Sequence, residues 1–422
     1  MSFPRYPSYK DSGVAWLGAV PGHWTVKRLR FVAELNPSKS EIGNFDRDIL
    51  VSFLPMDAIG EDGSLRLDSE RPIGELESGY TYFRDGDVTV AKITPCYENG
   101  KGALMRGLAN GIGFGTTELI VARPKPDEIL GPYLHYLFIS PEFRNLGESH
   151  MYGAGGQKRV PDAFVRDFAT AFPPTFEQTQ IAAFLDRETA RIDALVAEQR
   201  RLMELLKAQI TSLVLSSFDA PDTVKLRLSE ASIIVSRPVT QKADESYTRI
   251  GIFNRGRGLF HKDASEMDDM GESDFFWVEE GDLIISGQFA WEGAVALADK
   301  EDKGCVVSHR YPVIRGKSGV ALTEYLFALL CTEHGDFLMN ENSRGAAGRN
   351  RPLNISTLMK EQIPVPNMEV QKAVARAVRT HKALFTEIAD ATGLLQERRS
   401  ALISAAVTGQ IDIRHPFGEK DA

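Results

Sequence analysis

The sequence has few cysteines and no long apolar run. Only three of its 422 residues are cysteine (Cys96, Cys305 and Cys331), and no two of them form a Cys-x-x-Cys pair. We therefore expect neither a disulfide framework nor a structural zinc site, and a reducing compartment fits this pattern. No segment reaches the roughly 18 apolar residues of a membrane span, and the first residues lack the apolar core of a signal peptide. The sequence therefore predicts a cytoplasmic protein that does not involve a membrane.

Signatures of catalysis are missing as well. Residues 100–102 (GKG) lack the spacing and the hydroxyl residue of a phosphate-binding loop, and residues 111–115 (GIGFG) have the wrong spacing for a dinucleotide-binding motif. Residues 36–39 (NPSK) are not the Asn/Asp-Pro-Pro-aromatic motif of an amino-methyltransferase, and the eight histidines form no HExxH or HxH pattern. We therefore predict no catalytic residue, no cofactor-binding residue and no metal ligand, and we do not expect an enzyme.

Acidic and basic residues are unevenly distributed along the chain. It carries 49 Lys and Arg against 58 Asp and Glu, a net charge of -9, which excludes a DNA-binding protein that is basic over its whole surface. Residues 237–262 nevertheless hold six basic and two acidic side chains, whereas residues 263–302 hold 13 acidic side chains and one lysine. This segregation indicates one basic and one acidic surface, as a DNA-binding protein with a protein partner needs. Ordinary solvated loops are the alternative interpretation.

The second half of the sequence repeats the first. Three segments recur in the same order, shifted by 195, 192 and 192 residues: 86–90 (GDVTV) with 281–285 (GDLII), 133–134 (YL) with 325–326 (YL), and 153–159 (GAGGQKR) with 345–351 (GAAGRNR). Each copy starts with short β-branched runs that are typical of strands, continues with a proline-containing stop, and ends in a long segment with almost no Gly or Pro. The sequence therefore predicts a diverged internal duplication with an α+β fold.

The two long segments, 177–216 and 369–408, have a helical pattern. Alternating steps of three and four residues from Leu185 meet mostly apolar side chains, which favours a coiled-coil seam over two amphipathic helices packed on separate domains. A helix of about 40 residues is roughly 60 Å long and exceeds the ~30–40 Å diameter of a domain of this size, so we expect the two helices to pair. The predicted pairing residues are Leu185, Ile192, Leu195, Leu202, Leu206, Leu213, Val378, Phe385, Ile388, Leu395 and Leu402.

Two glycine-rich loops and a third basic segment are candidate DNA contacts. Glycine allows backbone N–H groups to approach phosphate closely, Arg and Lys can bind O6 and N7 of guanine, and Gln and Asn can bind N6 and N7 of adenine. The recurrence of such a loop in both halves favours a function over two unrelated solvated loops. The candidate DNA-binding residues are Lys92, Gln157, Lys158, Arg159, Arg255, Arg257, Gln288, Arg344, Arg349, Asn350 and Arg351.

Three motifs resemble segments of the specificity subunits of type I restriction-modification systems. Residues 10–18 (KDSGVAWLG) followed by 21–24 (PGHW) are similar to the opening of that family. Residues 173–186 (PPTFEQTQIAAFLD) resemble its first conserved helix, and residues 394–412 (LLQERRSALISAAVTGQID) resemble the end of its second. The second copy departs from the pattern, because its helix begins with MEVQ at 368–371 and not with Pro-Pro followed by Glu-Gln.

The resemblance implies a sequence-specific DNA-binding subunit without catalytic activity. Its implied fold has two mixed α/β target recognition domains, separated by two long helices that form an antiparallel coiled coil, as a pseudo-two-fold internal repeat. Each recognition domain reads one half of a bipartite DNA target, and the helices set the spacer between the halves. The expected bounds are 1–174 and 219–366 for the recognition domains, 175–218 and 367–410 for the helices, and 411–422 for a C-terminal tail.

Partners and cofactors follow from the same resemblance. Two modification (methyltransferase) subunits are expected to bind the helices and to supply S-adenosylmethionine and adenine flipping. Restriction subunits are expected to supply ATP- and Mg-dependent translocation and cleavage, and this chain itself is expected to hold no cofactor. Two other hypotheses remain open: a coiled-coil scaffold that binds only protein, and a stand-alone methyltransferase or nuclease, against which the missing motifs argue.

Overall fold

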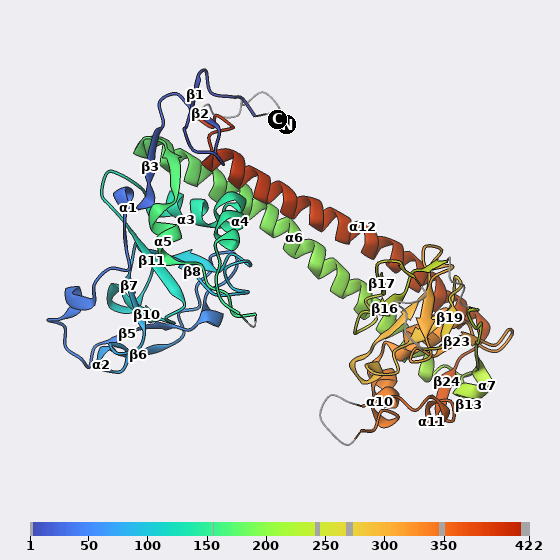
Figure 1. Ribbon diagram of the computed structural model, residues 1–422. Coiled ribbons are helices and arrows are strands. Elements are labelled where there is room, and N and C mark those ends of the chain that lie inside the picture. The colour runs from blue at the N-terminus through green and yellow to red at the C-terminus, as the bar shows by residue number, and fades with distance from the viewer. Residues whose placement is uncertain (1–2, 155, 241–244, 267–272, 346–350, 415–422) are drawn as a thin grey trace. The chain divides into compact units, whose positions relative to one another are not determined.

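The computed structural model describes residues 3–154, 156–240, 245–266, 273–345 and 351–414. The chain divides by its contacts into unit 1, residues 1–196 with 392–422, and unit 2, residues 197–391. The division falls inside both long helices, α6 (Thr175–Phe218) and α12 (Met368–Val407), which Figure 1 draws in green and red. Each unit therefore contains one half of each helix, and both helices match the segments expected from the sequence.

Unit 1 is built on two four-stranded sheets. One has the order β4-β11-β8-β9 and is antiparallel, and the other has the order β6-β5-β10-β7 with a parallel pairing of β10 and β5. Two further pairs, β1-β2 and β3-β12, are antiparallel. The strands are β1 (Tyr9–Asp11), β2 (Ala19–Pro21), β3 (Thr25–Arg28), β4 (Ala33–Leu35), β5 (Leu50–Leu54), β6 (Glu70–Pro72), β7 (Thr81–Arg84), β8 (Val88–Ala91), β9 (Gly102–Leu104), β10 (Ile112–Gly115), β11 (Leu119–Pro124) and β12 (Ala169–Phe172).

Short helices cover the first of these sheets. Helix α3 contacts β8, β9 and β11, and all four residues of β8 are buried, as the run of β-branched residues predicts for a central strand. The helices of unit 1 before α6 are α1 (Leu29–Val32), α2 (Ile73–Leu76), α3 (Gly131–Ile139), α4 (Pro141–Ser149) and α5 (Asp162–Asp167), with 3-10 turns η1 (Lys39–Ile42), η2 (Met56–Ala58) and η3 (Ala109–Gly111).

Unit 2 repeats the order of elements in unit 1. Its four-stranded sheet β14-β23-β20-β21 corresponds strand for strand to β4-β11-β8-β9, and its pair β13-β24 corresponds to β3-β12. Three other two-stranded pairs are β15-β18, β16-β17 and β19-β22. The strands are β13 (Val224–Arg227), β14 (Ser232–Ile234), β15 (Ser246–Tyr247), β16 (Ile250–Ile252), β17 (Leu259–His261), β18 (Ser265–Glu266), β19 (Phe275–Trp277), β20 (Leu283–Ile285), β21 (Val295–Leu297), β22 (Val306–Ser308), β23 (Val313–Gly316) and β24 (Gln362–Val365).

The helices of unit 2 follow the same plan. Helix α9 contacts β20, β21 and β23, as α3 contacts the equivalent strands of unit 1. The internal duplication predicted from the sequence is therefore confirmed. The helices of unit 2 before α12 are α7 (Leu228–Ala231), α9 (Thr323–Leu330), α10 (Glu333–Glu341) and α11 (Ile355–Leu358), with the 3-10 turn η4 (Ala290–Glu292).

A buried glutamine ties the start of helix α6 to unit 1. The side-chain nitrogen of Gln178 donates to the carbonyl oxygens of Glu128 at 3.0 Å and Pro173 at 2.9 Å. The side-chain oxygen of Gln178 accepts a hydrogen bond from the N–H of Leu130 at 2.8 Å. One side chain thus satisfies three main-chain groups, which would otherwise lack partners in a turn before α3 and in the approach to α6.

Gln371 makes the same three hydrogen bonds at the start of helix α12. Its side-chain nitrogen donates to the carbonyl oxygens of Val320 at 3.0 Å and Pro366 at 2.8 Å. Its oxygen accepts from the N–H of Leu322 at 2.8 Å. The helix entry at 368–371, which departs from the family motif in sequence, therefore keeps the contact that anchors the helix.

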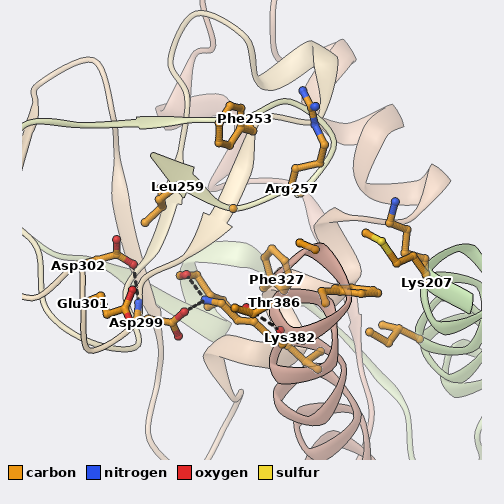
Figure 2. A pocket seen from close by; sticks show the side chains of 18 of the residues that line it. Lys207, Phe253, Arg257, Leu259, Asp299, Glu301, Asp302, Phe327, Lys382 and Thr386 are labelled. Carbon is orange, nitrogen blue, oxygen red and sulfur yellow. Dashed lines mark hydrogen bonds and ion pairs between the residues drawn. The ribbon is translucent and has the colours of Figure 1, made fainter. Parts of the chain in front are cut away.

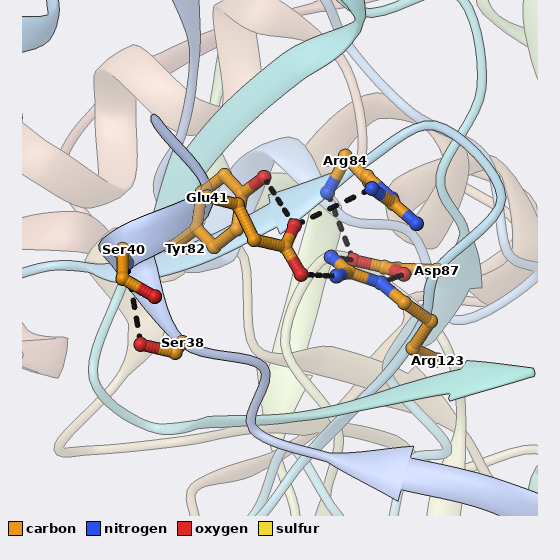
Figure 3. Close-up of polar contacts among 7 residues, drawn as sticks. All are labelled: Ser38, Ser40, Glu41, Tyr82, Arg84, Asp87 and Arg123. Carbon is orange, nitrogen blue, oxygen red and sulfur yellow. Dashed lines mark hydrogen bonds and ion pairs between the residues drawn. The ribbon is translucent and has the colours of Figure 1, made fainter. Parts of the chain in front are cut away.

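A buried aspartate stabilises the four-stranded sheet of each unit. In unit 1 the carboxylate of Asp87 accepts two hydrogen bonds from Arg123, at 2.7 and 2.8 Å, and Figure 3 shows the same guanidinium beside the carboxylate of Glu41. In unit 2 the carboxylate of Asp282 pairs with Arg315 at 2.5 Å. Because each aspartate is almost completely buried, the paired arginine offsets the cost of burying its charge.

The motif at the start of the chain contacts the start of helix α6. The completely buried carboxylate of Glu177 accepts hydrogen bonds from the hydroxyl of Tyr6 at 2.5 Å and from the indole N–H of Trp24 at 3.0 Å, and lies 2.7 Å from His23. Burial and the Glu177 carboxylate raise the pKa of Tyr6, so its hydroxyl keeps its proton and donates it. The resemblance motifs at 21–24 and 173–186 therefore form one contact.

Helices α6 and α12 contact each other within each unit. In unit 1 the start of α6 and the end of α12 share an apolar cluster that includes Leu185 and Leu402, and Asp193 pairs with Arg399 at 3.0 Å. In unit 2 the end of α6 and the start of α12 share a cluster that contains Val214, Val374 and Val378. The start of each helix therefore packs with the end of the other, as in an antiparallel pair.

The packed face of α6 differs from the predicted seam at every second position. The predicted residues Leu195 and Leu202 are 46% and 40% exposed, whereas Val196 is buried. Thr189 is buried too, and its hydroxyl donates to the carbonyl oxygen of Leu185 at 2.7 Å. The seam therefore steps by four and then three residues from Leu185, with Thr189, Val196, Met203 and Ile210 buried or half-buried. The predicted phase went wrong at its first step, where the buried residue is Thr189, whose hydroxyl is satisfied within the helix, and not Glu188. Of the other predicted residues, Leu185, Ile192, Val378, Ile388 and Leu402 are buried, and Leu206, Leu213, Phe385 and Leu395 are half-buried.

Candidate nucleic-acid interface

In unit 1 the glycine loop lies beside the end of strand β8. Lys92 directly follows β8, and its carbonyl oxygen accepts a hydrogen bond from the N–H of Val160 at 2.8 Å. The N–H of Thr94 donates to the carbonyl oxygen of Lys158 at 3.0 Å. Lys158 is exposed and Lys92 is half-buried. The structure thus brings together four of the candidate DNA contacts: Lys92, Gln157, Lys158 and Arg159.

Arg159 is oriented by an acidic residue that the sequence did not point to. Its Nε and Nη2 atoms donate to the carboxylate of Glu118 at 3.0 and 2.7 Å. The hydrogen bond from Arg159 holds the pKa of Glu118 below its usual range, so the carboxylate is charged at neutral pH. A guanidinium has five N–H donors, so the Nη1 side of Arg159 still has donors for an acceptor such as guanine O6 or N7. Glu118 therefore fixes the direction of Arg159 without using all of its donors.

Unit 2 makes the same main-chain connection at the end of strand β20. The N–H of Leu353 donates to the carbonyl oxygen of Gly287 at 2.8 Å. Gln288 comes next and is exposed, and its carbonyl oxygen accepts a hydrogen bond from the indole N–H of Trp291 at 3.2 Å. The guanidinium of Arg351 lies 5.4 Å from the centre of the Trp291 ring. Trp291 therefore brings Gln288 and Arg351 together, a role that no sequence motif indicated.

Arg255 and Arg344 are two further candidate arginines of unit 2 that the structure describes. The N–H of Arg255 donates to the carbonyl oxygen of Glu292 at 3.2 Å, which holds its loop against the turn η4. Arg344 is exposed, and its guanidinium lies 3.6 Å from the carboxylate of Glu341. The remaining two candidates, Arg349 and Asn350, lie outside the described residues.

Arg257, another candidate DNA contact, lines a cavity in unit 2. Its guanidinium lies 5.3 Å from the centre of the Phe253 ring, and both residues line a cavity of about 680 Å³ beside the long helices (Figure 2). Lys382 of helix α12 also lines it and pairs with Asp299 at 2.7 Å. Asp299, Glu301 and Asp302 also line the cavity, so it is not a uniformly basic surface of the kind that binds phosphate.

The described residues show no sign of a metal site or a membrane span. Among them, no three His, Cys, Asp or Glu side chains gather as metal ligands do. No helix in the same part of the chain is both long and apolar enough to cross a membrane.

Known proteins are similar to this chain over different extents. Residues 228–393 match the family model of the type I restriction modification DNA specificity domain. The specificity subunits of the type I restriction enzymes EcoAI and EcoEI from Escherichia coli are 42% identical over 202 residues and 39% identical over 201 residues. Each alignment covers 46% of this chain and 33% of the relative, so the match spans about a third of those proteins.

A solved structure is similar over nearly the whole chain. It comes from work on the complex assembly and conformational transition of the type I R-M system, and it covers 92% of this chain and 98% of its own chain with a TM-score of 0.61. Only 17% of the aligned residues are identical, so this likeness shows the fold alone.

Proposed function

We propose that the chain belongs to the family of type I restriction-modification specificity subunits and binds a bipartite DNA sequence. Its match to the type I restriction modification DNA specificity domain and its similarity to two specificity subunits support this proposal. Unit 1 reads one half of the target and unit 2 reads the other. The chain performs no chemistry itself and positions modification and restriction subunits on the DNA.

The observation that carries this proposal is the matching loop connection in the two units. The bond from Val160 to Lys92 holds the end of the glycine loop of unit 1 at the end of strand β8, and the bond from Leu353 to Gly287 holds the segment that contains Arg351 at the end of the equivalent strand β20. Base edges are read by Arg, Lys, Gln and Asn, which both loops supply, although different residues stand at equivalent positions. The two units therefore combine equivalent main-chain bonds with different side chains. A protein that reads two different half-sites requires such a combination.

The long helices are proposed to bind the modification subunits. Leu195, Leu202 and Leu205 are 46%, 40% and 58% exposed and follow one another along one side of helix α6. Exposed apolar side chains arranged along one helix favour contact with another protein. We expect the modification subunits to bring S-adenosylmethionine and adenine flipping, and the restriction subunits to bring ATP- and Mg-dependent translocation and cleavage.

Methylation profiling of DNA from a host that carries the complete system tests the proposal. We expect methylation at a bipartite target with a fixed spacer. Lys158→Ala should relax the half-site that unit 1 reads, and Arg351→Ala should relax the other half-site, because each exchange removes a side chain from only one loop. Equal weakening at all sequences would contradict base reading and indicate phosphate contacts.

The same exposed leucines keep one alternative open, a scaffold that binds only protein. Retention of a specific duplex by the chain with its modification partner, but not by the partner alone, excludes the scaffold. A chain that binds its partner and adds no preference for any duplex would instead favour it. Methyl transfer by the purified chain alone would contradict the absence of catalysis.

A further inference from the structure

The main-chain bonds at the ends of strands β8 and β20 form an equivalent frame around the loops of the two units. One position in this loop frame carries opposite charges in the two units. In unit 1 the N–H of Lys92 donates to the carbonyl oxygen of Glu118 at 2.8 Å, just before strand β11. In unit 2 the N–H of Gly287 donates to the carbonyl oxygen of Arg310 at 2.7 Å, just before the equivalent strand β23. Glu118 and Arg310 therefore occupy the same place in the duplicated fold.

The main chain of Arg310 packs closely against Gly287, which directly precedes the predicted DNA contact Gln288. A Cβ atom added to Gly287 would lie only 2.4 Å from the carbonyl oxygen of Arg310, so the two segments meet as closely as glycine permits. Gly287 also accepts the hydrogen bond from Leu353, and it precedes Gln288. Arg310 is thus one main-chain contact away from Gln288 and from the end of the loop that carries Arg351.

Glu118 pairs with Arg159 in unit 1, but unit 2 has no charged residue at the position equivalent to Arg159. Val160 and Leu353 make equivalent hydrogen bonds, so the residue equivalent to Arg159 is Pro352, which cannot pair with a charge. Arg310 is exposed, and within the described residues no side-chain hydrogen bond or ion pair of Arg310 is found. The half-buried arginine of the same sheet, Arg315, in contrast pairs with Asp282.

We propose that Arg310 is a specificity-determining residue of unit 2 that binds the major-groove edge of a guanine. This inference rests on the proposed DNA-reading function and names a residue that carries it. An arginine is suited to the role because its planar fork donates two hydrogen bonds to O6 and N7 of one guanine. Glu118 cannot make this contact in unit 1, where it orients Arg159, so the same frame presents two different side chains to two half-sites.

The test compares four versions of the chain in a host that carries the complete system. Arg310→Ala removes the side chain, and Arg310→Lys keeps the charge but loses the fork. Lys303→Ala is the matched control, because it removes one exposed positive charge near the opposite end of strand β20, where Lys303 pairs with Glu279 at 3.3 Å. Methylation profiles give both half-sites, and binding titrations of the assembled complex at several salt concentrations give the salt slope.

We expect Arg310→Ala and Arg310→Lys to relax one base pair in the half-site of unit 2, with a loss of discrimination of about 5- to 150-fold at that base pair. The half-site of unit 1 should stay unchanged, and Lys303→Ala should resemble the wild type. Unchanged profiles for both Arg310 variants would overturn the inference while the proposed function stands.

A phosphate contact gives a different result that also overturns it. Arg310→Ala would then weaken binding to all sequences and reduce the salt slope by about 0.9, and Arg310→Lys would restore binding without any change in sequence preference. If the wild-type complex leaves no bipartite methylation, the proposed function and this inference both fail.

Discussion

Replacement of Gln178 and of Gln371 by methionine should cost nearly the same stability in the two units. Methionine keeps the length and volume of glutamine but cannot form its three hydrogen bonds, which have almost identical lengths in the two units. Each exchange leaves one N–H and two carbonyl groups without their partner. Pro173 and Pro366, which supply one carbonyl group each, are buried, while the residues that supply the other two groups are half-buried.

These contacts set the expected magnitude. A buried main-chain group without a partner costs about 1–3 kcal/mol, and a group that water can still reach costs less. One buried and two half-buried groups together give roughly 2–5 kcal/mol for each variant, and the values for Gln178→Met and Gln371→Met should agree within about 1 kcal/mol.

Urea denaturation and amide hydrogen exchange measure this cost. Gln178→Met should accelerate exchange at the N–H of Leu130 and leave Leu322 protected, and Gln371→Met should do the reverse, because each glutamine holds only its own unit. Wild-type stability and wild-type exchange in both variants would refute the argument that these side chains anchor the helices. Acceleration of both amides by either variant would refute the independence of the two anchors.

Three further predictions concern the helix seam, a half-buried histidine and the loop of unit 1. Val196→Ala should lower the free energy of unfolding by roughly 1–3 kcal/mol, whereas Leu195→Ala should change it by less than about 0.5 kcal/mol, and equal values in thermal unfolding would contradict the seam described above. Burial lowers the pKa of His135 to about 4, so the unfolded chain binds a proton on this residue from about pH 6.5 downward while the folded chain does not. The free energy of unfolding should therefore fall by at most about 3 kcal/mol between pH 6.5 and 4, and urea titrations of His135→Gln should lack this part of the decrease, which comparison with the wild type at each pH measures. Glu118→Ala should strengthen binding to DNA of any sequence but reduce discrimination at the base that Arg159 reads, and unchanged discrimination in binding titrations would show that Arg159 needs no orientation.

The sequence predicts the duplication and the long helices because both are visible as patterns along the chain. A constant shift between the halves survives divergence, and a Gly- and Pro-poor segment of about 40 residues has few alternatives to a helix. The position of Thr189 in the seam is not visible in this way, because its burial depends on a hydrogen bond that a hydrophobic pattern does not record.

The residues of the proposed DNA-binding loops are predictable from the sequence only in part. Lys158 and Arg159 come from a recurring glycine-rich motif, so the sequence points to them. Glu118 lies 41 residues before Arg159, and only the pairing of β11 with β8 brings it there. Arg310 shares its place with a residue of opposite charge, so a search for matching residue types passes over it.

At Glu118 and Arg310 the main chain stabilises the fold, whereas the side chain differs between the two units. In both units the carbonyl oxygen of this residue makes the structural bond, and the side chain takes no part in that bond. The main-chain bond can therefore persist when the side chain at this position changes. Under the proposed function, a single codon change here would alter the base contact without loss of the fold. The two units already differ by a reversal of charge at this position, while the bond between the main chains is present in both.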